Sequence, residues 1–210
     1  MKIDLRAFIH IDDLQPQVAC FIASVAKGYP PLERQASLFI EVAPGMPINT
    51  MTDLALKSAE VTPGMQVVER AYGALELHSS DRAQVVAAGQ AILEHLGLKE
   101  EDRYAPAITT TQTLTGITGW HAMFINRFRH GNFLYENQTL YTLEVTPAAY
   151  AVFAANEAEK AAEINVLEII AFGAYGRLYL GGHEEEIAQA SARAIAGLKA
   201  ITGRPAPAAE

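Results

Sequence analysis

The sequence repeats itself at an offset of 103 residues. The motif Ala-Tyr-Gly-x-Leu-x-Leu occurs at residues 71–77 and again at residues 174–180. Between residues 19 and 92, the two copies share 21 identities over 74 positions aligned without a gap. Chance matching does not produce this agreement, and the interval is far too long for a solenoid repeat. The chain is therefore predicted to contain two tandem copies of one domain.

The joint between the copies is predicted near Arg103 and Tyr104, directly after the charged stretch at residues 99–103. This gives a first domain over residues 1–103 and a second domain over residues 104–210. The tail that starts at Gly203 is short and rich in proline and alanine, so we expect it to be frayed.

Each copy has the element order β-α-β-α-β-β-α, read from hydrophobic periodicity and from glycine and proline breaks. The elements expected in the first copy are strands at residues 3–11 and 37–42, helices at 17–27, 49–60 and from Asp81 to Gly97, and a hairpin at 65–77. In the second copy, residues 107–115 form a threonine-rich strand, and the last helix starts with the three glutamates 184–186. The pattern predicts an α+β fold with one antiparallel sheet per copy and helices packed on it. The turn of each hairpin is expected at the Tyr-Gly pair.

Composition excludes several classes of protein. The net charge of −8 argues against a nucleic-acid partner, and no apolar run is long enough to span a membrane. The N-terminus has early charges and no apolar core of a secretory signal. Cys20, the single cysteine, lies among apolar residues and is predicted to be a small core residue in a reducing cytoplasm.

Residues with metal or catalytic chemistry form no recognisable set. The six histidines have no spacing typical of metal ligands, and no motif for a nucleophile, a dinucleotide or a phosphate is complete. We therefore expect no metal, no cofactor and no enzymatic activity. Arg127, Arg129 and His130 form a small basic patch that could attract anions, although such a cluster is more often a solvated helix end.

The two copies differ just before the shared motif. Glu69-Arg70 in the first copy stands where the second copy has Phe172-Gly173. Taken alone, Glu69 and Arg70 are consistent with a solvated strand end. Tyr72, Tyr175 and Phe172 could form an aromatic collar, but we favour packing of the two tyrosines beneath the turns.

A family resemblance rests on the residues that precede each hairpin. Lys-Ser-Ala-Glu-Val at 57–61 and Lys-Ala-Ala-Glu-Ile at 160–164 are each followed by a strand, a glycine-containing turn, a strand and an alanine-rich helix. This resembles the shell domain of bacterial microcompartments (the BMC, ferredoxin-like, domain) in its circularly permuted form, because a strand and a helix come first. Two permuted copies with Glu-Arg in the first turn resemble the carboxysome-type tandem-domain shell proteins.

The resemblance implies an assembly and a set of sites. Three chains would form a pseudohexameric tile of a cytoplasmic microcompartment shell, two such tiles could stack, and other shell proteins would join the same facet. Glu69 and Arg70 would gate a central pore, and Ala71, Phe172 and Gly173 would line it. Small anionic metabolites would pass through the pore. Lys57 and Lys160 would make contacts at the tile edge; without the resemblance, each could simply be a cation at a helix C-terminus.

A different class of function is compatible with a duplicated α+β domain. The chain could be a soluble regulatory protein that binds a small molecule between its two domains. An enzyme that uses the same cleft is a weaker possibility, because no set of catalytic residues supports it. Trigonal particles with a central hole in electron micrographs would favour the shell protein, and compact monomers or dimers would favour the regulator.

Overall fold

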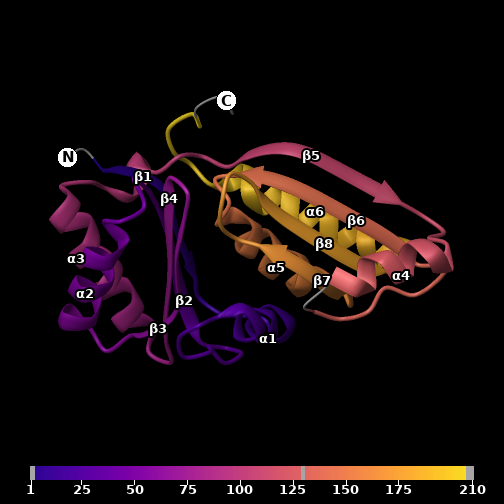
Figure 1. Cartoon of the computed structure of the whole chain (residues 1–210), viewed down its shortest axis with the longest axis horizontal. Coiled ribbons are helices and arrows are strands. Elements are labelled where there is room, and N and C mark those ends of the chain that lie inside the picture. The colour runs from indigo at the N-terminus through magenta and orange to yellow at the C-terminus, as the bar shows by residue number, and fades with distance from the viewer. Residues whose placement is uncertain (1–2, 129–130, 207–210) are drawn as a thin grey trace.

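The computed structural model describes residues 3–128 and 131–206, and it contains two four-stranded antiparallel sheets (Figure 1). The elements of the first half are β1 (Asp4–Ile11), α1 (Pro16–Val25), β2 (Ala36–Ala43), α2 (Ile48–Ser58), β3 (Thr62–Glu69), β4 (Tyr72–Ser79), α3 (Arg82–Leu96) and the short 3-10 helix η1 (Glu100–Asp102). Those of the second half are β5 (Ala107–Leu114), α4 (Gly119–Phe128), β6 (Thr139–Thr146), α5 (Tyr150–Ala161), β7 (Asn165–Ile170), β8 (Gly176–Gly182) and α6 (Glu184–Ala200).

The two halves have the same topology. The strand orders are β1-β2-β4-β3 and β5-β6-β8-β7. Leu5 pairs with Val42 in the first sheet, and Ile108 pairs with Val145 in the second, so the registers agree at the offset of 103 residues. The predicted α+β fold with tandem domains is confirmed. The boundary between residues 103 and 104 stays a prediction, although no sheet crosses it.

The first sheet is covered on both faces. One face packs on α2 and α3 through a cluster of buried side chains that includes Leu38, Leu75 and Ile92. The other face, with α1, belongs to a second cluster that continues into α5 and α6 of the second half. Along the long axis in Figure 1, the order is α2 and α3, the first sheet, then α5, then the second sheet, with α6 running alongside the second sheet. Burial of these apolar faces supplies most of the stabilisation.

The residues that follow the last helix are attached to the joint between the domains. Tyr104 and Arg204 form a parallel β-bridge, and Arg204 Nη2 lies 2.7 Å from Asp4 Oδ1. The Arg204 guanidinium also lies over the Tyr104 ring, 4.5 Å from its centroid. The prediction of a frayed tail from Gly203 is therefore wrong at Arg204; residues 207–210 lie outside the described part of the chain.

Cys20 is exposed, so its prediction as a core residue is wrong. Helix α1 buries Val18, Ala19, Phe21 and Ile22. On a helix with 3.6 residues per turn, position 20 lies on the face opposite to that stripe. Apolar neighbours in the sequence were therefore a poor guide to its burial.

Candidate functional site

The turn between β3 and β4 carries the acid–base pair. Glu69 pairs with Tyr72 as the last rung of the ladder, so Arg70 and Ala71 form a two-residue turn. Arg70 has a φ of +52°, a left-handed conformation that residues other than glycine rarely adopt. Its side chain is 92 % exposed, and its Nε lies 3.8 Å from Glu69 Oε1, whose side chain is 48 % exposed. The pair is thus held at the end of the sheet and remains accessible.

The turn is not at the Tyr-Gly pair, as the sequence had suggested. Gly73 lies inside β4 and faces the backbone of Gly45. A Cβ atom placed on Gly73 would lie 2.3 Å from the Gly45 carbonyl oxygen. The glycine is therefore required for a close approach of two backbone segments, and the chain reverses at residues 70–71, two positions before the Tyr-Gly pair.

The corresponding connection in the second half is a longer loop. β7 ends at Ile170 and β8 starts at Gly176, and the intervening loop contains Phe172 and Gly173. Gly173 occupies the position of Arg70 and also has a positive φ, +97°. Phe172 is half-buried and packs against the central apolar cluster.

The two connections meet within one chain. A Cβ atom placed on Gly173 would lie 3.7 Å from Glu69 Cγ. The structure therefore brings Glu69 together with Gly173, as the prediction of a shared site requires. We call residues 69–71 the charged tip and residues 172–173 the neutral tip. The structure holds one chain, so the gating and lining roles of these residues remain predictions.

A buried ion pair lies beneath the charged tip. Arg6 Nε lies 2.6 Å from Glu41 Oε1, and both side chains are almost completely buried. The Arg6 guanidinium also stacks on the Tyr72 ring, 3.8 Å from its centroid, which confirms that Tyr72 packs under the turn. Glu41 Oε2 accepts a hydrogen bond of 3.0 Å from the backbone N–H of Ala149, at the start of α5. This chain of contacts connects the tip to the second domain.

Burial raises the pKa of Glu41, and the Arg6 guanidinium opposes that rise, as do the N–H groups of Ala149 and Ala148. Glu41 and Glu144 occupy the same position in the repeat, and the sequence alone gives neither residue a role. A glutamate in the middle of a strand that is otherwise apolar was the available signal, because a buried carboxylate needs a partner.

Glu144 makes a different ion pair in the second half. Its Oε2 lies 2.8 Å from Nε of Arg177, a residue of β8, and both side chains are partly exposed. Thr109 stands in the position of Arg6, and its Oγ1 donates to the Glu144 carbonyl oxygen at 3.1 Å. The two copies therefore keep the carboxylate but take the cation from different strands.

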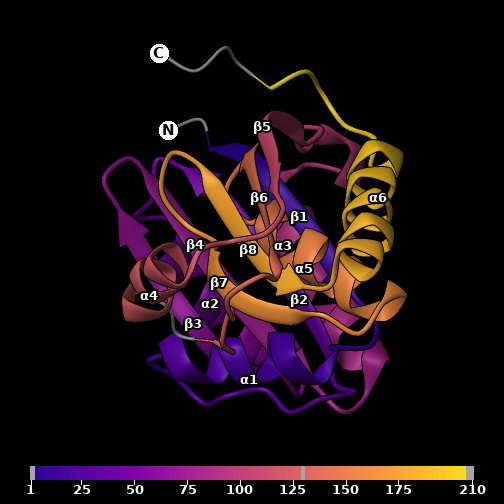
Figure 2. The same ribbon diagram turned by 90° about the vertical axis from the view of Figure 1, so that its right-hand side faces the viewer.

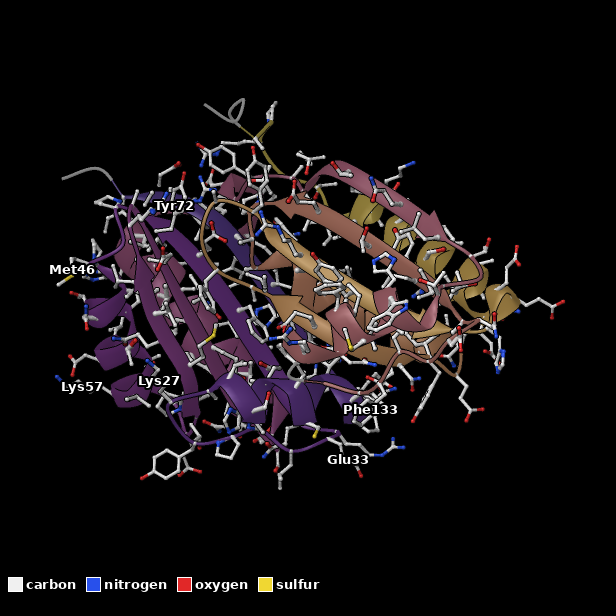
Figure 3. The ribbon with its side chains drawn as sticks, turned by 45° about the vertical axis from the view of Figure 1, so that its right-hand side comes forward. Lys27, Glu33, Met46, Lys57, Tyr72 and Phe133 are labelled. Atoms are coloured by element: carbon white, nitrogen blue, oxygen red, sulfur yellow. The ribbon has the colours of Figure 1, made fainter. Side chains whose placement is uncertain are left out.

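The two predicted edge lysines have unequal environments. Lys57 is exposed at the end of α2, and its Nζ lies 2.7 Å from Asp53 Oδ2. Lys160 is less exposed at the end of α5, and its Nζ lies 3.1 Å from Glu157 Oε1. Figure 3 shows Lys57 and Met46 on the outer side of the first domain, away from Phe133. Lys57 is thus exposed while it pairs with Asp53 on its own helix, and its edge role stays a prediction.

Metal ligands do not gather at any described position. Over residues 3–128 and 131–206, no group of three or more histidine, cysteine or acidic side chains is arranged to hold a metal ion. Nor does any helix there combine the length and the apolar character needed to span a bilayer. Arg129 and His130 of the predicted basic patch lie outside the described residues.

The comparisons with known proteins agree with this architecture. A family model described as the CsoS1D N-terminal domain matches residues 5–102. The carboxysome shell protein CcmP of Synechococcus elongatus is 48 % identical over 207 residues, which cover 99 % of this chain and 97 % of that protein. The carboxysome shell protein CsoS1D of Hydrogenovibrio crunogenus is 43 % identical, over 96 % of this chain and 99 % of that protein.

Two solved structures share the whole fold. One is the fused permuted hexameric shell protein MSM0275 from the RMM microcompartment, with a TM-score of 0.93 and 42 % identity over 95 % of this chain and 98 % of that chain. The other is the double-ringed trimeric shell protein MSM0271 from the same microcompartment, with a TM-score of 0.94 and 38 % identity over 97 % of this chain and 100 % of that chain.

Fold and comparisons together define a class, the microcompartment shell proteins made of two fused, permuted domains. Within that class, the chain belongs to the family of carboxysome shell proteins that includes CcmP and CsoS1D. The resemblance inferred from the two lysine motifs and the Glu-Arg turn is confirmed.

Proposed function

We propose that three copies of this chain form a pseudohexameric tile in the shell of a carboxysome, with a central pore that Glu69 and Arg70 gate. The observation that carries the proposal is the contact between the charged tip and the neutral tip within one chain. A ring of three chains would bring all six tips to one axis, with charged and neutral tips alternating. The similar structures described as hexameric and trimeric support such a ring.

The conformation of Arg70 favours a functional role. A left-handed arginine costs roughly 1–2 kcal/mol relative to the right-handed backbone, and the neutral tip has glycine at the same position. Ordinary packing gives no reason to keep a long cation at such a position, since 92 % of the side chain is exposed. Strain that packing does not explain is often found at functional sites.

The strength of the Glu69–Arg70 pair suits a gate. Exposed ion pairs contribute about 0.2–1 kcal/mol each, so three of them could bias an open and a closed state without locking either. Arginines at the axis would also attract small anionic metabolites. The pore would therefore pass such metabolites, and the protein itself would act as a structural element without catalysing a reaction. Two tiles could stack, as the description of the double-ringed relative suggests.

The gate is tested by counting pore states. We expect Glu69→Ala and Arg70→Ala to change the ratio of open to closed pores by about threefold to a hundredfold, because each removes three pairs per ring that contribute about 0.2–1 kcal/mol each. Particle classification by cryo-electron microscopy measures this ratio. Glu185→Ala, an exposed glutamate at the start of α6, is the matched control. Unchanged ratios in both tip variants would refute the gate, and compact monomers in place of rings would favour a soluble regulatory protein.

Lys57 is the proposed contact between neighbouring tiles, and Lys160 is its counterpart in the second half. We expect Lys57→Asp to abolish extended sheets while leaving single rings intact, because the exposed cation would become an anion at every edge. Sheets are detected by negative-stain microscopy, and rings by native mass spectrometry. Lys199→Asp, at the exposed end of α6, provides a control with the same charge change. Normal sheets from Lys57→Asp would exclude this role.

A further inference from the structure

The outer edge of the first sheet is covered by residues of the joint between the domains. β1 is an edge strand, and two of its backbone carbonyl groups accept hydrogen bonds from outside the sheet. The Tyr104 N–H donates to the Arg6 oxygen at 3.0 Å, and Nη1 of Arg103 donates to the Phe8 oxygen at 2.6 Å. Arg103 has an extended backbone, with φ −63° and ψ 162°. A short extended segment therefore pairs with β1.

The equivalent edge of the second sheet, along β5, is open. The offset of 103 residues places Thr109 and Thr111 at the positions of Arg6 and Phe8. Within residues 3–128 and 131–206, no donor outside the sheet bonds to the carbonyl oxygen of either threonine. Figure 1 shows β5 at the outer margin of the second sheet, and in Figure 2 the helices α6 and α4 lie to either side of it. The place that residues 103–104 take beside β1 is thus free beside β5.

The tail of the chain cannot pair with β5 in the same way. The equivalents of Arg103 and Tyr104 in the second copy are Ala206 and Pro207. Alanine has no side-chain donor, and proline has no backbone N–H. The tail is also held at the joint, where Arg204 forms its bridge and its ion pair. A segment that pairs with β5 as residues 103–104 pair with β1 would therefore belong to another molecule.

β5 lacks the features by which proteins usually protect a free sheet edge. Charged side chains, proline and a short length prevent unwanted pairing of edge strands. β5 has eight residues, Ala-Ile-Thr-Thr-Thr-Gln-Thr-Leu, with no charge and no proline. The edge strands on the opposite sides of the sheets differ: β3 contains Pro63 and Glu69, and β7 contains Glu168. The register shift between Ile108 and Thr110 does not set β5 apart, because β1 has the same shift. The edge of β5 is therefore suited to accept a further strand.

We propose that β5 binds an extended, arginine-containing segment of another protein as an additional strand of the second sheet. In such strand addition, backbone hydrogen bonds supply the affinity, and side chains supply the specificity. The N–H and C=O of one residue point the same way in an antiparallel ladder, so Thr111 and Thr113 would each offer a donor and an acceptor. Arginine is favoured because Arg103 serves this role beside β1, and because the chain has a net charge of −8. This inference does not depend on the pore, and the bound segment would attach its own protein to this one.

A labelled peptide tests the strand addition. The probe is Thr-Arg-Tyr-Thr-Val-Arg with an N-terminal fluorescein, which repeats the Arg-Tyr pair of residues 103–104 among residues that favour strands. We expect saturable binding to the full chain by fluorescence anisotropy. The control peptide has the same sequence with methyl groups on the backbone nitrogens of its tyrosine and valine, so it keeps the charges and loses two N–H donors. It should bind about tenfold more weakly or worse, because strand pairing needs those donors.

Thr111→Pro tests the same contact from the side of the protein. Proline removes the N–H that would point at the added strand, and it is tolerated on an edge strand where that N–H faces solvent. We expect the variant to keep the parent circular dichroism spectrum and to bind the peptide about tenfold more weakly. Glu184→Pro, at the exposed first residue of α6, is the control, because proline is tolerated at that helix position. It should bind the peptide like the parent chain.

Hydrogen exchange distinguishes the possible occupants of the edge. Measured by mass spectrometry over residues 107–114, exchange at Thr111 and Thr113 should be fast in the parent chain and slow about tenfold when the peptide binds. Slow exchange without peptide would mean that a second copy of the chain already covers β5, which would overturn the proposal. Equal binding of the methylated and unmethylated peptides would mean charge attraction only and would overturn it too, as would the absence of saturable binding. The methylated peptide decides the question even if Thr111→Pro does not fold.

Discussion

Replacing Arg6 with methionine is expected to lower the free energy of unfolding by about 3–5 kcal/mol, because it leaves the Glu41 carboxylate buried without its cation. Urea titrations at one fixed subunit concentration measure the change, since oligomerisation makes stability depend on concentration. The stacking of Arg6 on Tyr72 would be lost as well, which adds to the effect at the charged tip.

The second domain provides the matched control. Arg177→Met breaks the corresponding Glu144 pair, but both partners are partly exposed, so we expect a loss of only about 0–1 kcal/mol. Arg6→Met combined with Glu41→Gln should regain part of the loss, because the buried charge is removed too. Equal losses for Arg6→Met and Arg177→Met would contradict the proposed role of burial.

The Arg6→Met deficit should depend on pH. Burial already raises the pKa of Glu41, and removing the guanidinium raises it further. A carboxyl group whose pKa is higher in the folded state binds its proton more tightly there. The buried carboxyl group therefore lowers the free energy of unfolding least at pH values below the ordinary glutamate pKa. Relative to the parent chain, the deficit should grow as the pH rises through the folded-state pKa of Glu41. A deficit independent of pH would exclude an ionised Glu41 as its cause.

Replacing Gly73 with alanine is expected to cost about 3 kcal/mol, at the upper end of the usual penalty for overpacking. The added Cβ would lie 2.3 Å from the Gly45 carbonyl oxygen, and backbone cannot move aside as a flexible side chain can. Thermal or urea unfolding measures the loss. Gly176→Ala should behave alike, since its Cβ would lie 2.2 Å from the Ala148 carbonyl oxygen.

Gly97→Ala separates this steric effect from the general cost of losing a glycine. Gly97 ends α3 with a φ of +64°, and nothing lies within 4 Å of a Cβ placed there. We expect a loss of about 1 kcal/mol from the left-handed backbone alone. A Gly73→Ala variant no less stable than Gly97→Ala would show that the two backbone segments can separate.

Much of the fold could be predicted from the sequence. Hydrophobic periodicity within each segment indicates helices and strands, and the internal repeat indicates two domains. The predicted strand at residues 37–42 and helix at 49–60 differ from β2 and α2 by two residues or fewer at each end. The turn was misplaced because glycine is favoured both in turns and where two backbone segments approach closely. Gly73 is of the second kind. Cys20 was predicted to be buried, but it lies on the face of α1 that the rest of the protein leaves exposed.

The parts of the site that were missed depend on contacts between distant residues. Arg6 and Glu41 are 35 positions apart, and the Ala149 N–H is a further 108 positions along the chain. No periodicity in the sequence links these residues: pairing of β1 with β2 brings Arg6 to Glu41, and docking of the two domains brings the Ala149 N–H to the same carboxylate. Glu69 and Arg70 could be identified from the sequence because the second copy has Phe172 and Gly173 at the same positions.

The joint at residues 103–104 has a consequence for how rings come apart. Three of the six domain contacts in a ring would lie within chains, where a short connection gives a high effective concentration, and three would lie between free molecules. Dilution should therefore release intact two-domain units and never separated domains. The in-chain contact can therefore keep a buried polar group such as Glu41 beside its apolar cluster, because the connection holds the two domains together.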